Sequence, residues 1–385
     1  MASGLEIGVE EVAAQAVGWR RHLHAHPELS FQERETSAFV RETLASFDAG
    51  LELSSPTPTS VVARLRGGRP GPTLALRADL DALPIHEESG VEFSSTVPGV
   101  MHACGHDGHT AMLLAVARVL SAQRDELPGE IRFLFQHAEE LPPGGARELV
   151  AAGVLDGVDA VVGCHLFSDL ETGKVVALAG PALAAADVFS ARISGKGGHG
   201  AMPHKSIDPI PVAAAAITGL QQIVSRETSP IDNVVVSVTR IAAGTADNII
   251  PEAVELGGTV RTFKPELRES TRAAMQRILD GVSAAHGATA EFTYTEGYSP
   301  TVNDDALAAL VREEAGSERF APYEPIMGGE DFSAYGSVAP ACFFFVGAGG
   351  PGAFPHHHPR FTIDEAALPV GIETTLRVAR RFLAG

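Results

Sequence analysis

Short apolar runs alternate with helix-like stretches through much of this chain, and this alternation is the feature that most constrains its fold. Predicted strands, each bounded by glycine or proline, cover residues 61–65, 73–79, 131–136, 159–165 and 342–346. Helical stretches are expected at 9–24, 110–123 and 146–152. Strands and helices in alternation form a largely parallel sheet covered on both faces. The predicted fold class is therefore α/β.

Polar residues fall where these strands end. Asp79, Glu139, Glu140 and His165 each lie at or just past the end of a predicted strand. Binding sites in such sheets form outside the carboxyl ends of the strands. The sequence therefore places a candidate site along this edge of the sheet.

The middle of the chain, from about residue 187, has a different order of elements. Strands are predicted at 188–194, 233–241, 254–263 and 289–295, and helices at 209–226 and 266–286. The order βαββαβ is that of a ferredoxin-like unit. Alternation resumes after residue 297, through a helix at 305–314, to a last helix at 365–383.

Two domains are also expected from length, since 385 residues exceed the roughly 250 to 300 at which one core stops growing. We predict an α/β domain in two parts, 1–184 and 298–385, interrupted by an inserted domain at 185–297.

Charge and cysteine usage exclude several classes of protein. A net charge of −19, from 48 acidic against 29 basic residues, repels phosphate backbones and anionic lipid surfaces. Neither a nucleic acid nor a membrane partner is expected. No apolar run approaches the roughly 20 residues of a membrane span, and the first residues lack the pattern of a signal peptide. Three cysteines are too few for a disulfide framework, so a cytoplasmic protein is the simplest expectation.

Cys104 and His106 lie two residues apart, just before an apolar helical stretch. Soft sulfur and imidazole nitrogen at this spacing suit a divalent transition ion. Taken alone, the pair is equally consistent with a buried cysteine beside a surface histidine, and Glu139 with Glu140 is equally consistent with a solvated acidic turn. Further potential ligands recur, however, at His165 and in a run of three histidines at 356–358. Together they favour a metal centre.

Seven stretches spread along the chain carry a family resemblance. They are LRADLDALPI (76–85), MHACGHDGH (101–109), FQHAEE (135–140), GKGGHGAMPH (195–204), DNIIP (247–251), GEDF (329–332) and HHPRF (357–361). In this set and order, the sequence resembles the aminoacylase and carboxypeptidase superfamily of di-metal hydrolases. Within it, the chain is similar to the branch of hippurate hydrolases and auxin-conjugate (IAA-amino acid) amidohydrolases.

The resemblance implies two divalent metal ions per subunit. Its implied ligands are Cys104, His106, Glu140, His165 and His357. His357 is chosen because the family motif places the ligand two residues before the proline, here Pro359. His358 competes with it, because the intervening residue in the family is usually not histidine. The soft thiolate of Cys104 together with imidazole ligands favours zinc, and the metals used across the family leave manganese, cobalt and nickel as candidates. The loop after Glu140 contains a proline pair, Pro142 and Pro143, that departs from the family pattern.

The resemblance also implies roles beyond the ligands. Glu139 would be the general base, because a carboxylate next to a ligand can take a proton from water. Asp79 would support the site without touching metal, a role that Asp81 could equally fill. His102 and His109, which flank the ligand turn, are expected to support it as well.

The inserted domain is expected to serve as a lid and dimerisation domain. His199 would reach the active site of the partner in a homodimer and stabilise the oxyanion. Asn248 is a candidate for binding the substrate's carboxylate. Arg261 is a second candidate, although a strand-surface arginine is as good a reading.

The function implied is hydrolysis of the amide bond of a small N-acyl amino acid by a metal-activated water. One alternative is a dipeptidase or carboxypeptidase of the same superfamily, against which the form of the Cys104 turn argues. The other is a non-enzymatic binding protein on the same scaffold. Such a protein is expected to have lost a ligand or the base, and none is missing from this sequence.

Overall fold

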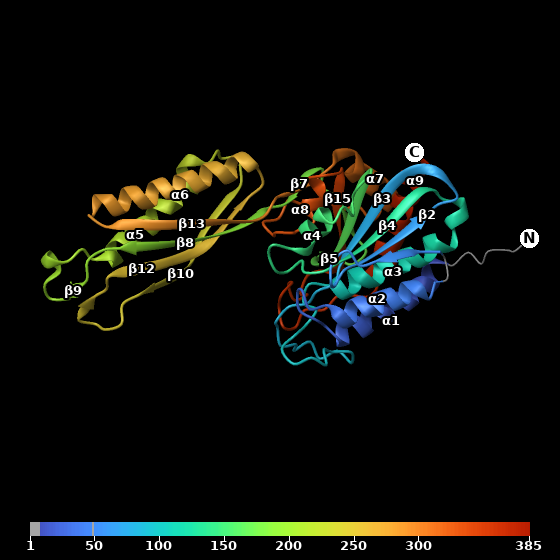
Figure 1. The fold of residues 1–385 in the computed structure, drawn as a ribbon, viewed down its shortest axis with the longest axis horizontal. Helices are drawn as coiled ribbons and strands as arrows, with labels where there is room; N and C mark the ends of the chain where they lie inside the picture. The colour runs from blue at the N-terminus through green and yellow to red at the C-terminus, as the bar shows by residue number, and fades with distance from the viewer. Residues whose placement is uncertain (1–7, 48–49) are drawn as a thin grey trace, which may run out of the picture. The chain divides into compact units, whose positions relative to one another are not determined.

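This computed structural model describes residues 8–47 and 50–385 of the chain (Figure 1). The N-terminal residues 1–7, where the expectation about a signal peptide applies, lie outside the described residues. Two compact units are present. The first comprises the chain up to Ala182 with Val302–Glu324 and Asp331–Gly385, and the second comprises Leu183–Thr301 with Pro325–Glu330.

A seven-stranded sheet, in the order β1-β2-β4-β3-β5-β15-β6, forms the centre of the first unit. Its strands are β1 (Glu52–Ser54), β2 (Val61–Arg66), β3 (Arg69–Asp79), β4 (Pro128–Gln136), β5 (Ala160–Glu171), β6 (Val175–Val176) and β15 (Ala341–Gly349). The four strands β4, β3, β5 and β15 pair in parallel, and the outer strands are antiparallel. The prediction of a largely parallel sheet is therefore confirmed.

Successive residues of the central strands point to opposite faces of the sheet and are buried alike, which indicates that both faces are covered. Along β15, Ala341–Ala348 are all buried. The longer helices of this unit are α1 (Val9–Ala25), α2 (Arg34–Ala45), α3 (His106–Ala122), α7 (Asp305–Ala315) and α9 (Ala367–Ala384), and the shorter ones are α4 (Gly145–Ala151) and α8 (Ser333–Gly336). Helix α3 packs against α1 and α9, and most of its residues are buried in the main core.

The structure differs from the sequence-based boundaries in several places. Helix α3 begins at His106 and not at residue 110, so His106 and His109 lie in its first turn. Helix α2 was not predicted, although Thr36, Val40 and Leu44 recur at a spacing of four and are its buried residues. Strand β5 continues past His165 to Glu171, because its extension pairs with β15.

The second unit is a four-stranded antiparallel sheet in the order β10-β12-β8-β13. Its strands are β8 (Ala185–Ser194), β10 (Val234–Ala243), β12 (Ala253–Thr262) and β13 (Thr289–Tyr298), and its helices are α5 (Pro209–Gln222) and α6 (Pro265–Ala285). Asp208 caps α5 by accepting a hydrogen bond from the Ile210 amide at 3.0 Å. The order and pairing are those of the predicted ferredoxin-like unit.

Short strand pairs complete the structure. β9 (Gly198–His199) pairs with β11 (Ile249–Ile250), and β7 (Gly180–Leu183) pairs with β14 (Thr301–Asn303). In the described part of the chain, no helix combines the length and apolarity needed to cross a bilayer.

Candidate metal centre

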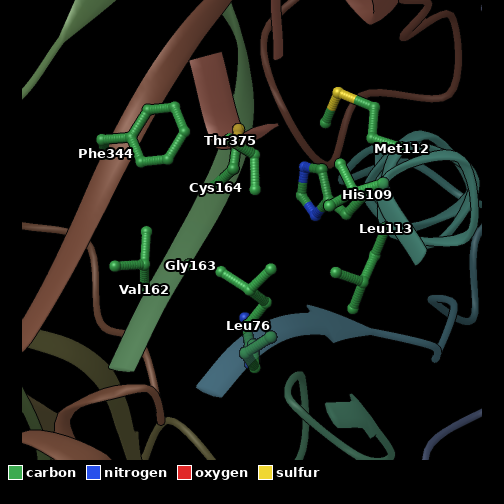
Figure 2. A pocket seen from close by; sticks show the side chains of 11 residues that line it. Leu76, His109, Met112, Leu113, Val162, Gly163, Cys164, Phe344 and Thr375 are labelled. Carbon is green, nitrogen blue, oxygen red and sulfur yellow. The ribbon is translucent and has the colours of Figure 1, made fainter. Parts of the chain in front are cut away.

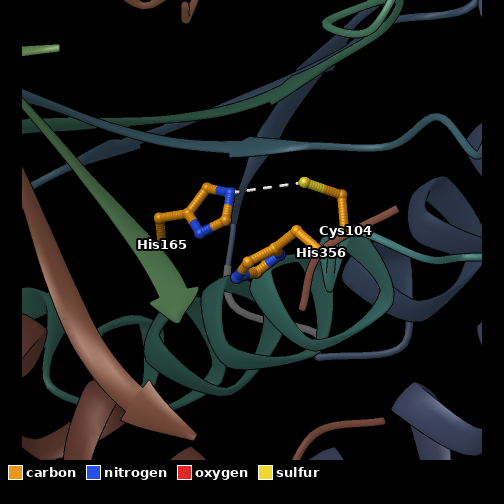
Figure 3. Close-up of side chains that lie close together, drawn as sticks. All are labelled: Cys104, His165 and His356. Carbon is orange, nitrogen blue, oxygen red and sulfur yellow. Dashed lines mark hydrogen bonds between the residues drawn. The ribbon is translucent and has the colours of Figure 1, made fainter. Parts of the chain in front are cut away.

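Cys104 and His165 face each other between α3 and β5. Cys104 lies in the turn before α3, where Gly105 adopts a left-handed φ of 92° without the strain that a side chain would add. Nε2 of His165 is 3.6 Å from Sγ of Cys104 (Figure 3). Nδ1 of His165 donates to the carbonyl oxygen of Leu166 at 2.7 Å. This bond fixes the proton on Nδ1, so Nε2 keeps its lone pair, as a metal ligand requires.

His106, Glu140 and His357 bring together three more possible ligand atoms. Oε1 of Glu140 lies 3.8 Å from Nε2 of His106 and 3.3 Å from Nε2 of His357. Within residues 8–47 and 50–385, neither Nε2 of His106 nor Oε1 of Glu140 makes a hydrogen bond. Sγ of Cys104 lies within 4.8 Å of the ligand atoms of His106 and Glu140. Buried ligand atoms that converge without bonding one another fit a cation between them.

The charges around these atoms also favour a cation. Burial acts to lower the pKa of His106, but Asp79 and Asp81 outweigh it and raise this pKa to about 10. Burial and the Glu140 carboxylate raise the pKa of the Cys104 thiol well above its ordinary value. A thiolate here requires a positive charge close by to offset the carboxylates. The donor set therefore fits divalent metal ions and argues against Cys104 as a free nucleophile.

His356, the first of the three adjacent histidines, lies beside Cys104 and His165 (Figure 3). Its Nε2 accepts a hydrogen bond from the Ser168 amide at 3.1 Å. The proton of the neutral ring is then on Nδ1, which leaves no free lone pair for a metal. Burial lowers the pKa of His356 to about 3, so the ring is neutral. His356 forms part of the wall of the site.

The next two histidines point in different directions. His357 faces Glu140, as described above. Nδ1 of His358 accepts a hydrogen bond from the Arg360 amide at 3.0 Å, and its ring stacks on Phe354 with 4.6 Å between centroids. The geometry therefore favours His357 over His358 as a ligand.

His109 has both ring nitrogens engaged. Nε2 accepts a hydrogen bond from the Leu166 amide at 2.8 Å, and Nδ1 donates to Oδ1 of Asp79 at 2.7 Å. Although His109 lies close to His106 and His165, it has no lone pair left for a metal. His102 is also buried, and burial lowers its pKa to about 4.

Asp79 belongs to a fully buried network behind the metal ligands. Its Oδ2 accepts a hydrogen bond from Arg77 at 2.7 Å and lies 3.7 Å from Nε2 of His106. The same guanidinium donates to Gln136 at 2.8 Å and to Asp331 at 2.9 Å. Arg77 thus joins the ends of β3 and β4 to the residue that precedes Phe332 in the GEDF motif. The sequence pattern did not reveal Arg77 or Asp331 as parts of the site.

Asp81 faces the candidate ligand His106, with 3.3 Å between Oδ1 and Nδ1. The two oxygens of Asp81 also accept hydrogen bonds from the amides of Glu139 and Glu140, each at 3.0 Å. Asp79 hydrogen-bonds to His109, whereas Asp81 faces Nδ1 of His106, so the geometry favours Asp81 as the aspartate that supports this candidate ligand. The D-x-D spacing in the sequence was compatible with either assignment.

Three residues other than glycine have a left-handed backbone in the described structure: Phe31, with φ of 65°, Ala138, with φ of 51°, and His357, with φ of 65°. Such conformations cost about 1 to 3 kcal/mol each and concentrate at functional sites. His357 is a candidate ligand, and Ala138 directly precedes Glu139. The backbone is thus strained where the candidate catalytic residues attach.

A small cavity lies behind the centre, among α3, β3, β5 and β15 (Figure 2). Its lining includes His109, Met112, Cys164 and Phe344, and its volume is about 20 Å³. This volume holds one water molecule, so the cavity is too small for a substrate.

The second unit brings His199 and Asn248 together. His199 pairs with Ile249 across β9 and β11, and the Gly200 amide donates to the Asn248 carbonyl at 2.9 Å. Nδ1 of His199 accepts a hydrogen bond from the Ala201 amide at 3.1 Å. Nε2 of the exposed ring therefore carries the proton and can donate it to an anionic oxygen. Arg261 lies on β12, half-buried, and burial lowers its pKa.

The fold and the centre define a class of protein. Thiol, imidazole and carboxylate groups converge next to a largely parallel sheet. Such a donor set is typical of a metal-dependent hydrolase. The chain belongs to the peptidase family M20/M25/M40, whose model matches residues 75–381.

Individual relatives agree with this assignment. The chain is 59% identical over 297 residues to an N-acyl-L-amino acid amidohydrolase of Geobacillus stearothermophilus, covering 77% of this chain and 80% of that protein. It is 40% identical over 384 residues to thermostable carboxypeptidase 2 of Saccharolobus solfataricus, covering 98% of each. The crystal structure of Bacillus subtilis YXEP, a dinuclear metal binding peptidase, matches with a TM-score of 0.86 and 39% identity, covering 97% of this chain and 99% of that one.

Proposed function

We propose that this protein is a metal-dependent amidohydrolase that cleaves the amide bond of N-acyl amino acids, releasing a carboxylic acid and a free amino acid. The observation that carries the proposal is the convergence of the possible ligand atoms of Cys104, His106 and Glu140. The similarity to an N-acyl-L-amino acid amidohydrolase supports the substrate class. An intact set of ligands and base argues against a non-enzymatic binding protein.

Five residues would hold two divalent ions per subunit: Cys104, His106, Glu140, His165 and His357. Zinc and manganese are favoured, and cobalt and nickel are further candidates, because the donors mix soft sulfur, imidazole and carboxylate. When bound, the ions would polarise the scissile carbonyl and acidify the attacking water.

Glu139 is the proposed general base. It takes the proton from the attacking water and passes it to the leaving amine. Asp81 accepts hydrogen bonds from the amides of Glu139 and Glu140 and so helps to hold the turn that carries both residues. Asp81 also keeps the ring of His106 in place. No covalent intermediate is required.

His199 is proposed to stabilise the oxyanion, in the active site of the partner of a homodimer. Its protonated Nε2 supports this role. Asn248, next to it in the structure, is the proposed partner of the substrate's carboxylate, with Arg261 as a second candidate.

The proposed homodimer forms through the inserted domain. Strands β10 and β13 are the edges of its sheet, and edge strands present unpaired backbone groups to a second chain. Ile241 on β10 is 58% exposed, which supports this edge as the contact. A cytoplasmic location is supported by three free cysteines, Cys104, Cys164 and Cys342.

A turnover screen tests the proposed function. The protein is reloaded separately with zinc, manganese, cobalt and nickel, and assayed against N-acyl amino acids varied at both ends. Release of free amino acid from N-acetyl or N-benzoyl substrates is expected with at least one metal. Absence of turnover with all four metals and both acyl groups contradicts the proposal.

Carboxypeptidase activity is the second candidate, because a carboxypeptidase is among the similar proteins. Benzoylglycine and glycylglycine separate the two activities, since they differ in whether the amino side carries an acyl group or a free amine. Preference for the dipeptide is the result that favours a peptidase.

A further inference from the structure

Three consecutive backbone amides of the turn that carries the proposed base are held by two buried carboxylates. The amides of Glu139 and Glu140 donate to the two oxygens of Asp81, each at 3.0 Å. The amide before them, that of Ala138, donates to Oε1 of Glu33 at 2.8 Å. Glu33 comes from the N-terminal part of the chain, 105 positions away from Ala138.

The same oxygen of Glu33 holds a second strained residue. The Phe31 amide donates to Oε1 of Glu33 at 3.0 Å. Phe31 and Ala138 are two of the three left-handed residues other than glycine in the described structure. A left-handed conformation at such residues persists only where surrounding contacts enforce it. One carboxylate oxygen, Oε1 of Glu33, therefore holds the left-handed backbone at both Phe31 and Ala138.

The side chain of Glu33 does not serve as a helix cap. Glu33 is the N-cap residue of α2, yet its side chain makes no capping hydrogen bond. It is fully buried. Burial and the nearby Asp81 raise the pKa of Glu33, while hydrogen bonds from Thr59 and the Ala138 amide act in the opposite direction. Burying a carboxyl group is unfavourable unless it is hydrogen-bonded, and here Oε1 accepts from the amides of Phe31 and Ala138.

We propose that Glu33 is a positioning residue for the reaction: by holding the Ala138 amide, it keeps the left-handed turn that directs the Glu139 carboxylate. The inference rests on the proposed role of Glu139 as the general base. Without Glu33 the Ala138 amide loses its acceptor and the turn can relax to an ordinary backbone conformation. The base is then displaced, while the metal ligands and the substrate contacts remain.

Three substitutions at this position test the proposal on metal-loaded protein. Glu33→Ala removes the acceptor and is expected to lower kcat about ten- to hundredfold, the scale of a displaced catalytic group, with KM changed less than about threefold. Glu33→Gln keeps an oxygen in place of Oε1 and is expected to restore kcat to within about threefold of wild type. Glu33→Asp keeps the charge, but its shorter side chain is expected to behave like alanine.

Glu28→Ala is the matched control. Its carboxylate also accepts a backbone hydrogen bond, from the Thr36 amide at 2.8 Å, but on α2 and away from the turn. The control is expected to keep wild-type kcat per folded, metal-loaded protein. Metal content and the folded fraction are measured for every variant, so that kcat refers to intact sites.

Equal kcat in wild type and Glu33→Ala, per folded and metal-loaded site, overturns the proposal, even if the variant is less stable. If Glu33→Ala does not fold, Glu33→Asp and Glu33→Gln decide, and equal kcat in these two contradicts the positioning role. Failure of the proposed function looks different, because the wild type then shows no turnover with any of the metals. Failure of Glu139 as the base is also distinct, because Glu139→Gln then retains turnover whatever the variants at Glu33 do.

Discussion

The surroundings of His24 predict that the free energy of unfolding depends on pH. Its Nδ1 lies 2.8 Å from Oδ2 of Asp107 and its Nε2 lies 3.1 Å from Oε1 of Glu87. Asp107 also accepts a hydrogen bond from Arg20 at 2.8 Å, so the network ties α1 to the first turn of α3, where His106 lies. A ring between two carboxylates satisfies both of them only when both nitrogens are protonated.

The magnitude follows from the pKa. Burial acts to lower the pKa of His24, but Asp107 and Glu87 prevail and raise it from 6.5 to about 9. Each pH unit of such a difference is worth about 1.4 kcal/mol. The protonated histidine therefore adds about 3 kcal/mol to the free energy of unfolding. Because the pKa is raised on folding, this stability is fully present below pH 6.5 and is lost as the pH rises through about 9.

Urea unfolding of wild type and His24→Gln, at one fixed concentration of free metal, measures the effect. The difference in free energy of unfolding is expected to shrink by about 3 kcal/mol between pH 6 and pH 9.5. In a Glu87→Gln background the shrinkage is expected to be smaller, because one carboxylate partner is gone. Parallel curves for the two proteins over this range, or a difference that grows with pH, would refute a charged His24.

Three further predictions concern the proposed chemistry. Glu139→Gln is expected to keep both metals and the fold but to lose at least about a hundredfold in kcat; steady-state kinetics with metal analysis checks this, and wild-type turnover removes Glu139 as the base. Cys104→Ser is expected to lower metal affinity strongly, because an alcohol is neither soft nor deprotonated at neutral pH; two tightly held ions in metal analysis contradict it. Mixed refolding of His199→Ala with Glu139→Gln is expected to regain up to about a quarter of wild-type activity, because random pairing into symmetric dimers gives one complete site in each mixed dimer; heterodimers without activity rule out action in trans.

The fold was predictable because its signals are local. The short apolar runs bounded by glycine or proline and the order βαββαβ can both be read from neighbouring residues. Two features of the first unit were not predicted. Helix α2 has only a narrow buried stripe, at Thr36, Val40 and Leu44, and the extension of β5 depends on pairing with a strand about 170 residues later in the chain.

The site was only partly predictable, because several of its distinctions depend on tertiary hydrogen bonds. The three adjacent histidines cannot be told apart in the sequence. In the structure, the Ser168 amide donates to Nε2 of His356, so the proton of that ring is on Nδ1 and neither nitrogen is free to bind a metal. Asp79 and Asp81 look equally suitable, and they are separated by which histidine each one faces. The ligand and base assignments, and the role of the inserted domain, stay predictions until metal analysis and kinetics test them.

The position of β15 in the sheet has a consequence for how the chain is made. β15 lies between β5 and β6 but comes from the last fifth of the chain. At about 5 to 20 residues per second of synthesis, the partner strand β5 waits on the order of ten to thirty seconds on the ribosome with an apolar edge unpaired. The ferredoxin-like unit, encoded within that interval, pairs its four strands among themselves. During translation, the second unit can therefore complete its sheet before the metal-binding unit that was begun first.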